Sequence, residues 1–227
     1  QVFVFTLIGI AANVGSTPDY TPKSNTVYKL TLEGNLSDNT EENPIAMLMG
    51  ETDKSLSLKD ILSSIQTAKE NKNIKGIYIE AKGLSTGSAS LEAIRRALND
   101  FKENGKFIVA YSDNYTQGCY YLCSVADKVF LNPQGTLGLV GMASQTMFYK
   151  DLLKKVGVEM MIFKVGTYKG AVEPFMLDKL SDANREQIQS YISTIWDNVT
   201  NGIAESRKIQ VADINNFANQ GLSLIHI

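Results

Sequence analysis

The stretch Ile74–Tyr111, IKGIYIEAKGLSTGSASLEAIRRALNDFKENGKFIVAY, contains two apolar segments with an amphipathic segment between them. Ile74–Glu80 and Phe107–Tyr111 are short and rich in isoleucine, valine and tyrosine, which is typical of buried strands. Leu91–Asn104 carries apolar residues at helical spacing, and Gly105 follows it as a frequent helix terminator. A strand, a helix and a second strand with short connections predict a βαβ unit.

The same alternation continues on both sides of this unit. Before it, Val27–Leu32 alternates between apolar and polar residues like a half-buried strand, and Ser57 precedes an apolar helical stripe as its N-cap. The helix expected at Asp182–Ser206 carries an apolar stripe that we expect to face a core. The other predicted elements are a loop at Gly83–Ser90 with Ser90 as helix N-cap, helices at Gln117–Ala126 and Thr146–Val156, strands at Lys128–Leu131 and Glu159–Val165, and a glycine-rich turn at Asn132–Gly141. Together they predict an α/β fold with a largely parallel sheet flanked by helices.

The composition narrows the classes of function. The chain has 227 residues, 44% of them hydrophobic and 20% charged, with a net charge of −2. Nucleic acid is therefore not an expected partner. The single histidine, His226, lies beside the end of the chain, which excludes a Ser-His-Asp triad, and no residue cluster suggests a metal or other cofactor. Cys119 and Cys123 share a predicted helix whose geometry disfavours a disulfide, so we expect both to be small buried residues.

The first residues form an apolar segment of their own. Val2–Val14 is uncharged, but its length of about 13 residues is less than the roughly 20 that span a bilayer. We interpret residues 1–14 as a truncated membrane anchor or signal remnant, with a buried strand as the alternative. Residues 15–45 follow as a linker or arm, and residues 46–220 as the folded domain. The ending departs from the pattern expected after the last helix, so it stays open whether residues 222–227 are native.

Residues Phe163–Phe175, FKVGTYKGAVEPF, contain the candidate catalytic residue, Lys169. The apolar run Met160–Val165 predicts a buried strand that ends at Gly166. Lys169 is then expected to be largely buried on the turn into a helix, with its nitrogen toward a cleft. Burial disfavours the ammonium form, and a neutral lysine can act as a general base, as in serine–lysine hydrolases. The alternative is an ordinary surface lysine.

Four segments resemble a known family in their order and spacing: Asn114–Tyr121 (NYTQGCYY), Asn132–Gly135 (NPQG), Tyr149–Leu153 (YKDLL) and Val165–Phe175 (VGTYKGAVEPF). They resemble the N-terminal half of long-form bacterial signal peptide peptidase A, also called protease IV, over roughly residues 45–220. The resemblance implies a ClpP/crotonase-like fold of stacked βαβ units around a largely parallel sheet, assembled as a homo-oligomer. It also implies a bacterial inner-membrane protein, anchored at its N-terminus, with the peptidase domain in the periplasm.

The resemblance further implies that two tandem units share the catalytic dyad. The lysine of the GTYK motif falls on Lys169, and the serine nucleophile belongs to the C-terminal half of the same protein. The implied substrates are apolar, extended peptides such as signal-peptide remnants, bound by strand addition at a sheet edge. The nucleophile position of catalytic units holds Gln117 here, and an amide cannot replace a serine. We therefore expect this fragment to be inactive alone.

Other hydroxyl and thiol groups lie near the expected site, and we assign them structural roles in loops, helix caps and the core: Ser85, Ser88, Ser90, Ser112, Ser124 and Cys119. Two further functions stay open. One is a non-catalytic oligomerisation or scaffold module of the same fold, which the missing nucleophile favours. The other is a crotonase-type acyl-CoA enzyme, which would need acid/base carboxylates, and the Gly83–Ser90 loop has none.

Overall fold

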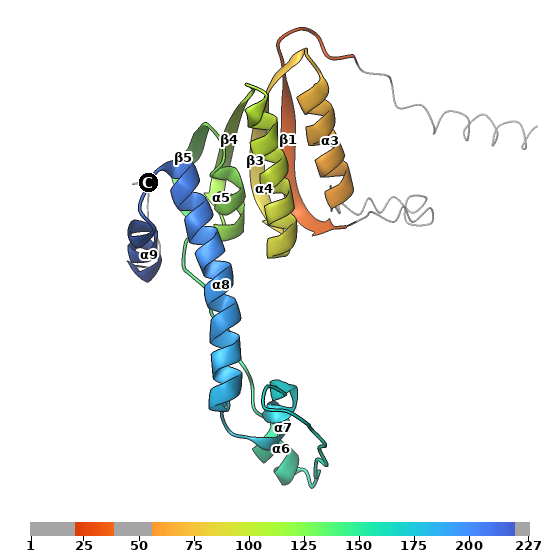
Figure 1. Ribbon diagram of the computed structural model, residues 1–227, viewed down its shortest axis with the longest axis vertical. Helices are drawn as coiled ribbons and strands as arrows, with labels where there is room; N and C mark the ends of the chain where they lie inside the picture. The colour runs from red at the N-terminus through yellow and green to blue at the C-terminus, as the bar shows by residue number, and fades with distance from the viewer. Residues whose placement is uncertain (1–20, 39–55, 221–227) are drawn as a thin grey trace, which may run out of the picture.

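The computed structural model describes residues 21–38 and 56–220 (Figure 1). The anchor expected at Val2–Val14, His226 and the ending at 222–227 lie outside these ranges, as do residues 15–20 and 39–45 of the expected linker. The described part of that linker is mostly strand, since it contains Thr26–Ser37, so a linker is the wrong prediction there. Within the described ranges, no helix is both long enough and apolar enough to cross a membrane.

A five-stranded sheet forms the body of the molecule (Figure 1). Its strands are β1 (Thr26–Ser37), β2 (Leu56–Ser57), β3 (Ile74–Ser85), β4 (Phe107–Tyr115) and β5 (Lys128–Leu137). The spatial order is β2-β1-β3-β4-β5, and every neighbouring pair is parallel. Ile77 on β3 is in register with Tyr28 on β1 and with Ile108 on β4. The parallel sheet confirms the α/β fold predicted from the alternation of elements.

Three helices lie over one face of this sheet: α3 (Leu58–Glu70), α4 (Ser88–Glu103) and α5 (Gln117–Cys123) (Figure 1). Ser57 caps α3 as predicted, because its side chain accepts a hydrogen bond from the N–H of Asp60. The core lies between the sheet and these helices, where Ile77, Ile108 and Phe101 are fully buried. Burying one such side chain stabilises the fold by about 1.5–3 kcal/mol, so this layer holds most of the stability.

The remaining elements extend away from the sheet. Helix α8 (Asp182–Arg207) reaches back to the body from a distant cluster of short elements, and α9 (Val211–Gln220) follows it (Figure 1). The short elements are α6 (Lys150–Lys155), the 3-10 turn η1 (Gly170–Val172) and α7 (Glu173–Met176). We call residues 149–181, which contain them, the distal segment. The apolar stripe of α8 is only partly covered: Ile203 is buried against the body, whereas Ile188, Ile192 and Ile195 are half-exposed.

Several predicted boundaries are wrong. The turn expected at Asn132–Gly141 is partly strand, because β5 continues through Asn132–Gly135 and pairs with β4 up to Leu137. Glycine is needed there, since a Cβ on Gly135 would lie 1.9 Å from the carbonyl oxygen of Asp113. Helix α4 begins at Ser88 with Gly87 as its N-cap, so Ser90 lies inside the helix.

The strand expected at Glu159–Val165 does not form. No described strand lies beside this segment to pair with it, and its apolar side chains are uncovered. Met161, Phe163 and Val165 are 83%, 89% and 90% exposed. The apolar composition of this segment predicted a buried strand, but the described chain contains no element that would bury it.

Candidate functional site

Lys169 lies in the distal segment, immediately before η1. It is the N-cap of this turn, with φ −102° and ψ 61°, and it is exposed to solvent. The expectation that Lys169 is largely buried at the end of a strand is therefore wrong for the single chain. Burial would need covering groups on several sides, and the described chain covers it only with its own turn and the start of α8.

An open hollow of about 490 Å³ lies beside Lys169. Its lining is mainly apolar, from Phe163, Val165, Tyr168 and Val172, with Asn184 and Gln187 of α8 on one side. A lysine at the edge of an apolar hollow loses much of its hydration once a second surface closes over it. The arrangement is chemically suited to a proton acceptor that is completed by a neighbour.

Glu173 is the one buried charged residue close to Lys169 in the described chain, at 1% exposure. Its carboxylate accepts hydrogen bonds from the N–H of Ser181 at 3.1 Å, from the Ser181 hydroxyl, and from Nδ2 of Asn184 at 3.0 Å. Burial alone would raise the pKa of Glu173, but these hydrogen bonds and the charge of Lys164 hold the pKa below its usual value. Glu173 thus binds the start of α8.

Gln117 lies at the start of α5, in the body of the molecule. Its side-chain oxygen accepts hydrogen bonds from the N–H groups of Val140, at 3.2 Å, and Gly141, at 3.0 Å. Thr116 caps the same helix by accepting from the N–H of Cys119. The position that the resemblance assigns to a nucleophile therefore holds an amide that fixes the chain leaving β5.

Lys169 and Gln117 are not brought together within this chain. Helix α5 lies on the sheet, whereas η1 and α7 belong to the distal segment at the far end of α8 (Figure 1). Within the described residues, Lys169 and Gln117 therefore do not form a joint site.

The other candidate nucleophiles have structural roles. The Ser112 hydroxyl donates to the carbonyl of Ala81, and the Ser124 hydroxyl donates to the carbonyl of Tyr121. Cys119 and Cys123 are free and buried, as predicted, and burial raises the pKa of the Cys123 thiol far above its usual value. Ser85 ends β3, and both Ser88 and Ser90 lie in the first turn of α4.

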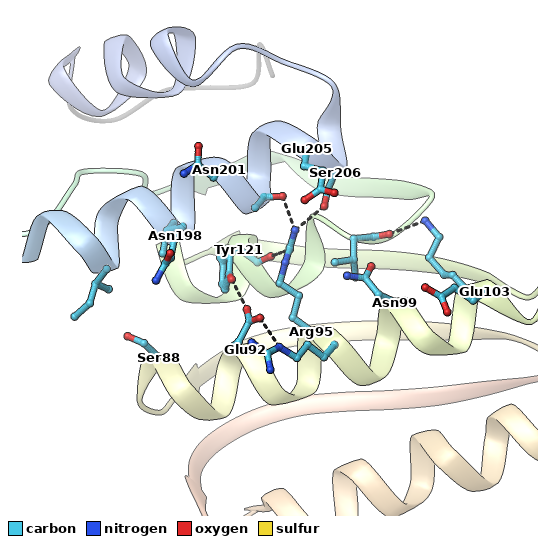
Figure 2. A pocket seen from close by; sticks show the side chains of 16 residues that line it. Ser88, Glu92, Arg95, Asn99, Glu103, Tyr121, Asn198, Asn201, Glu205 and Ser206 are labelled. Atoms are coloured by element: carbon cyan, nitrogen blue, oxygen red, sulfur yellow. Dashed lines mark hydrogen bonds and ion pairs between the residues drawn. The ribbon is translucent and has the colours of Figure 1, made fainter. Parts of the chain in front are cut away.

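A buried arginine joins α4, α5 and α8, and sequence reasoning missed it. Arg95 donates hydrogen bonds to the carbonyls of Tyr121 and Gly202 and to the Ser206 hydroxyl (Figure 2). It also donates to the hydroxyl of Ser124. Its guanidinium also lies 4.5 Å from the centre of the Tyr121 ring. Burial lowers the pKa of Arg95, although the group stays charged at neutral pH.

Tyr121 and Glu92 form a second hydrogen-bonded pair beside Arg95. The Tyr121 hydroxyl donates to Glu92, at 2.6 Å, and burial together with this carboxylate raises the pKa of Tyr121 to about 12. These residues line a cleft of about 760 Å³ between α4 and α8 (Figure 2). The signal available in the sequence was an arginine directly after Ile94 on a helix whose apolar stripe faces the core.

Comparison with known proteins gives consistent matches. The family model described as Peptidase family S49 matches residues 100–224. "Protease 4" of Salmonella typhi is 42% identical over 154 residues, which cover 67% of this chain and 25% of that protein. "Protease 4" of Haemophilus influenzae (strain ATCC 51907 / DSM 11121 / KW20 / Rd) is 33% identical over 229 residues, or 97% of this chain and 37% of that protein. The chain therefore spans between a quarter and two fifths of the length of these two relatives.

A plant protein and a solved structure are also similar. "Serine protease SPPA, chloroplastic" of Arabidopsis thaliana is 29% identical over 200 residues, covering 88% of this chain and 28% of that protein. The solved structure "1510-N membrane-bound stomatin-specific protease S97A mutant" matches with a TM-score of 0.42 and 11% identity, over 87% of this chain and 71% of that chain.

Proposed function

Because the chain belongs to peptidase family S49, we propose that it is the N-terminal half of a serine–lysine peptidase in which Lys169 is the general base. The nucleophilic serine comes from the C-terminal half of the same protein, and this chain alone is inactive. Relatives of the chain are protease 4 and SppA peptidases, and the proposal adds the division of labour between the two halves of such a protein.

One observation carries this proposal: Lys169 is accessible beside an apolar hollow in the distal segment, whereas Gln117 lies in the body of the molecule at the start of α5. A base that acted on its own unit would have to lie near α5. The separation, together with an amide at the nucleophile position, supports a dyad shared between two units.

The proposed reaction uses two groups, the amine of Lys169 and the serine hydroxyl of the C-terminal half. Neutral Lys169 accepts the proton of the serine hydroxyl while the serine oxygen attacks the peptide carbonyl. The lysine then passes this proton to the leaving amine, and the acyl-enzyme forms. In the second half of the reaction, Lys169 takes a proton from water, the water oxygen attacks the acyl carbon, and the proton returns to the serine oxygen.

Exposed apolar residues before Lys169 support extended, apolar peptides as substrates. Met161, Phe163 and Val165 lie in a segment with no strand beside it in the described chain, which leaves backbone groups available for strand addition. For the whole protein we propose attachment to the bacterial inner membrane through the N-terminal anchor, with the peptidase domain in the periplasm.

The test is replacement of the base in the full-length protein. Lys169→Ala should lower kcat on an apolar peptide ester by about 10²- to 10⁴-fold, since a positioned general base contributes that much. Lys179→Ala, an exposed lysine in the same segment, is the control and should stay within about twofold. Full activity in Lys169→Ala would exclude Lys169 as the base.

The amide of Gln117 favours one alternative, a scaffold module of the same fold that only supports assembly. In that case Lys169→Ala leaves peptide hydrolysis unchanged, and the catalytic serine finds its base within its own half. The same experiment therefore separates the two functions.

A further inference from the structure

We infer that Glu173 is a positioning residue that holds Lys169 in its working place without touching it. The inference rests on the proposed function, because it concerns the placement of the proposed base. The Glu173 carboxylate is buried in a segment that is otherwise largely exposed.

A buried carboxylate is costly unless its oxygens are hydrogen-bonded. Glu173 meets this requirement with three donors, all from the start of α8: the N–H and hydroxyl of Ser181 and the side-chain amide of Asn184. The positive end of the α8 dipole adds to this stabilisation. Removal of any donor would leave a buried charge undersatisfied, so the carboxylate fixes the start of α8 to the residues just before α7.

The connection from Glu173 to Lys169 is short and stiff. Lys169 is the N-cap and Glu173 the C-cap of the same 3-10 turn, Gly170–Val172. The first residue of this turn is also in contact with α8, since a Cβ on Gly170 would lie 2.3 Å from the side chain of Asn184. Asn184 therefore binds Glu173 at one end of the turn and packs on Gly170 at the other.

The residues after Glu173 fix the turn from its other side. The carbonyl of Pro174 accepts a hydrogen bond from the N–H of Tyr149 at 2.7 Å, and the Phe175 ring stacks on the Tyr149 ring. The Lys169 turn is thus held between α8 and the start of α6. Loss of the Glu173 contacts would leave only the packing of Asn184 on Gly170 and the contacts with Tyr149.

A small displacement of a base is enough to matter for catalysis. Misplacement by about 1 Å, caused by a change away from the reacting atoms, can cost about 100-fold in rate. Glu173→Gln keeps the size of the side chain but removes its charge and one of the two oxygen acceptors that Ser181 and Asn184 use. We expect this change to move the turn and Lys169 with it.

The experiment uses the full-length protein and an apolar peptide ester. Glu173→Gln should lower kcat by about 10- to 100-fold while KM stays within about twofold. In the Lys169→Ala background, the same change should have no further effect on kcat. Glu159→Gln, an exposed glutamate of the distal segment, is the matched control and should stay within about twofold in both backgrounds.

The outcomes separate this inference from the proposed function. If Lys169→Ala is inactive but Glu173→Gln is fully active, or if the two losses multiply, the positioning role is wrong and Lys169 remains the base. If Lys169→Ala is active, the proposed base is wrong, and the positioning role falls with it. Should Glu173→Gln fail to fold, Asn184→Ala removes one donor to the carboxylate, and the same cycle with Lys169→Ala decides.

Discussion

Two buried charged side chains hold the two ends of α8. Glu173 accepts hydrogen bonds from Ser181 and Asn184 at the start of the helix, and Arg95 donates to Gly202 and Ser206 near its end. The helix dipole favours the negative Glu173 at the N-terminal end of α8 and the positive Arg95 near its C-terminal end. The long helix is therefore fixed by electrostatics as well as by packing, because the apolar stripe of α8 is only half covered along its first half.

Replacement of Arg95 should weaken the attachment of α8 to the body. Arg95→Met leaves the carbonyls of Tyr121 and Gly202 without these donors, and we expect the free energy of unfolding to fall by about 3 kcal/mol. Arg96→Met is the control, since that arginine is exposed and forms a surface ion pair with Glu92, and it should cost about 0.5 kcal/mol or less. Urea denaturation of both variants measures the difference. Equal losses would mean that the buried network adds little.

The lowered pKa of Glu173 predicts a pH dependence of its contribution to stability. Its ordinary value is 4.5, and the pKa in the folded chain is lower. The carboxylate therefore stabilises the fold fully above about pH 5, and this contribution is lost as the pH falls through the lowered pKa. The difference in Tm between the wild type and Glu173→Gln should be largest near pH 6 and should shrink toward pH 3. A constant difference across this range would contradict the ionised, hydrogen-bonded state.

At the level of elements, periodicity predicted the layers that bury their own apolar faces. Helices α3, α4 and α8 and strands β1, β3 and β4 were each predicted at or near their places, because their patterns match the sheet and helix faces they cover. The failures share a cause. Glu159–Val165 has strand composition but no described neighbour, and Asn132–Gly135 has turn composition but follows β4 through a close contact at Gly135. In both cases the structure of the segment depends on a neighbouring segment, and local composition carries no information about that neighbour.

The connection between β5 and the distal segment depends on Gln117, which leads to a prediction about this element. Gln117→Ala removes the acceptor for the N–H groups of Val140 and Gly141, and their hydrogen exchange should become at least about tenfold faster. Gln117→Glu keeps an oxygen acceptor and should preserve most of the protection. Unchanged exchange in Gln117→Ala would show that other contacts hold this connection.

For the whole molecule, exposed apolar side chains are concentrated at the end farthest from the sheet. In the distal segment they are Leu152, Val156, Val158, Met160, Met161, Phe163, Val165, Tyr168, Phe175 and Met176. So much uncovered apolar surface in one place is uncommon on a monomer and marks a contact surface. It also explains the limit of the sequence prediction: the apolar run before Lys169 predicted a buried lysine, but the described chain supplies too few groups to cover it.

We therefore propose that the full-length protein forms a homo-oligomer in which a second copy covers the distal segment. The double substitution Phe163→Ser and Val165→Ser should weaken self-association of the full-length protein by about 100-fold or more, since burying each apolar side chain contributes about 1.5–3 kcal/mol. Val27→Ser, a partly exposed valine on β1 of the body, is the control and should change association little. Light scattering over a concentration series measures both.

Activity provides a second measure, because Phe163 and Val165 line the same hollow as Lys169. If the substitutions act only on assembly, peptide hydrolysis should fall at low protein concentration and recover as the concentration rises, by mass action. If they remove substrate contacts instead, the loss should persist at every concentration and appear as a higher KM. An unchanged association constant with full activity would mean that neither a neighbouring copy nor the substrate covers Phe163 and Val165.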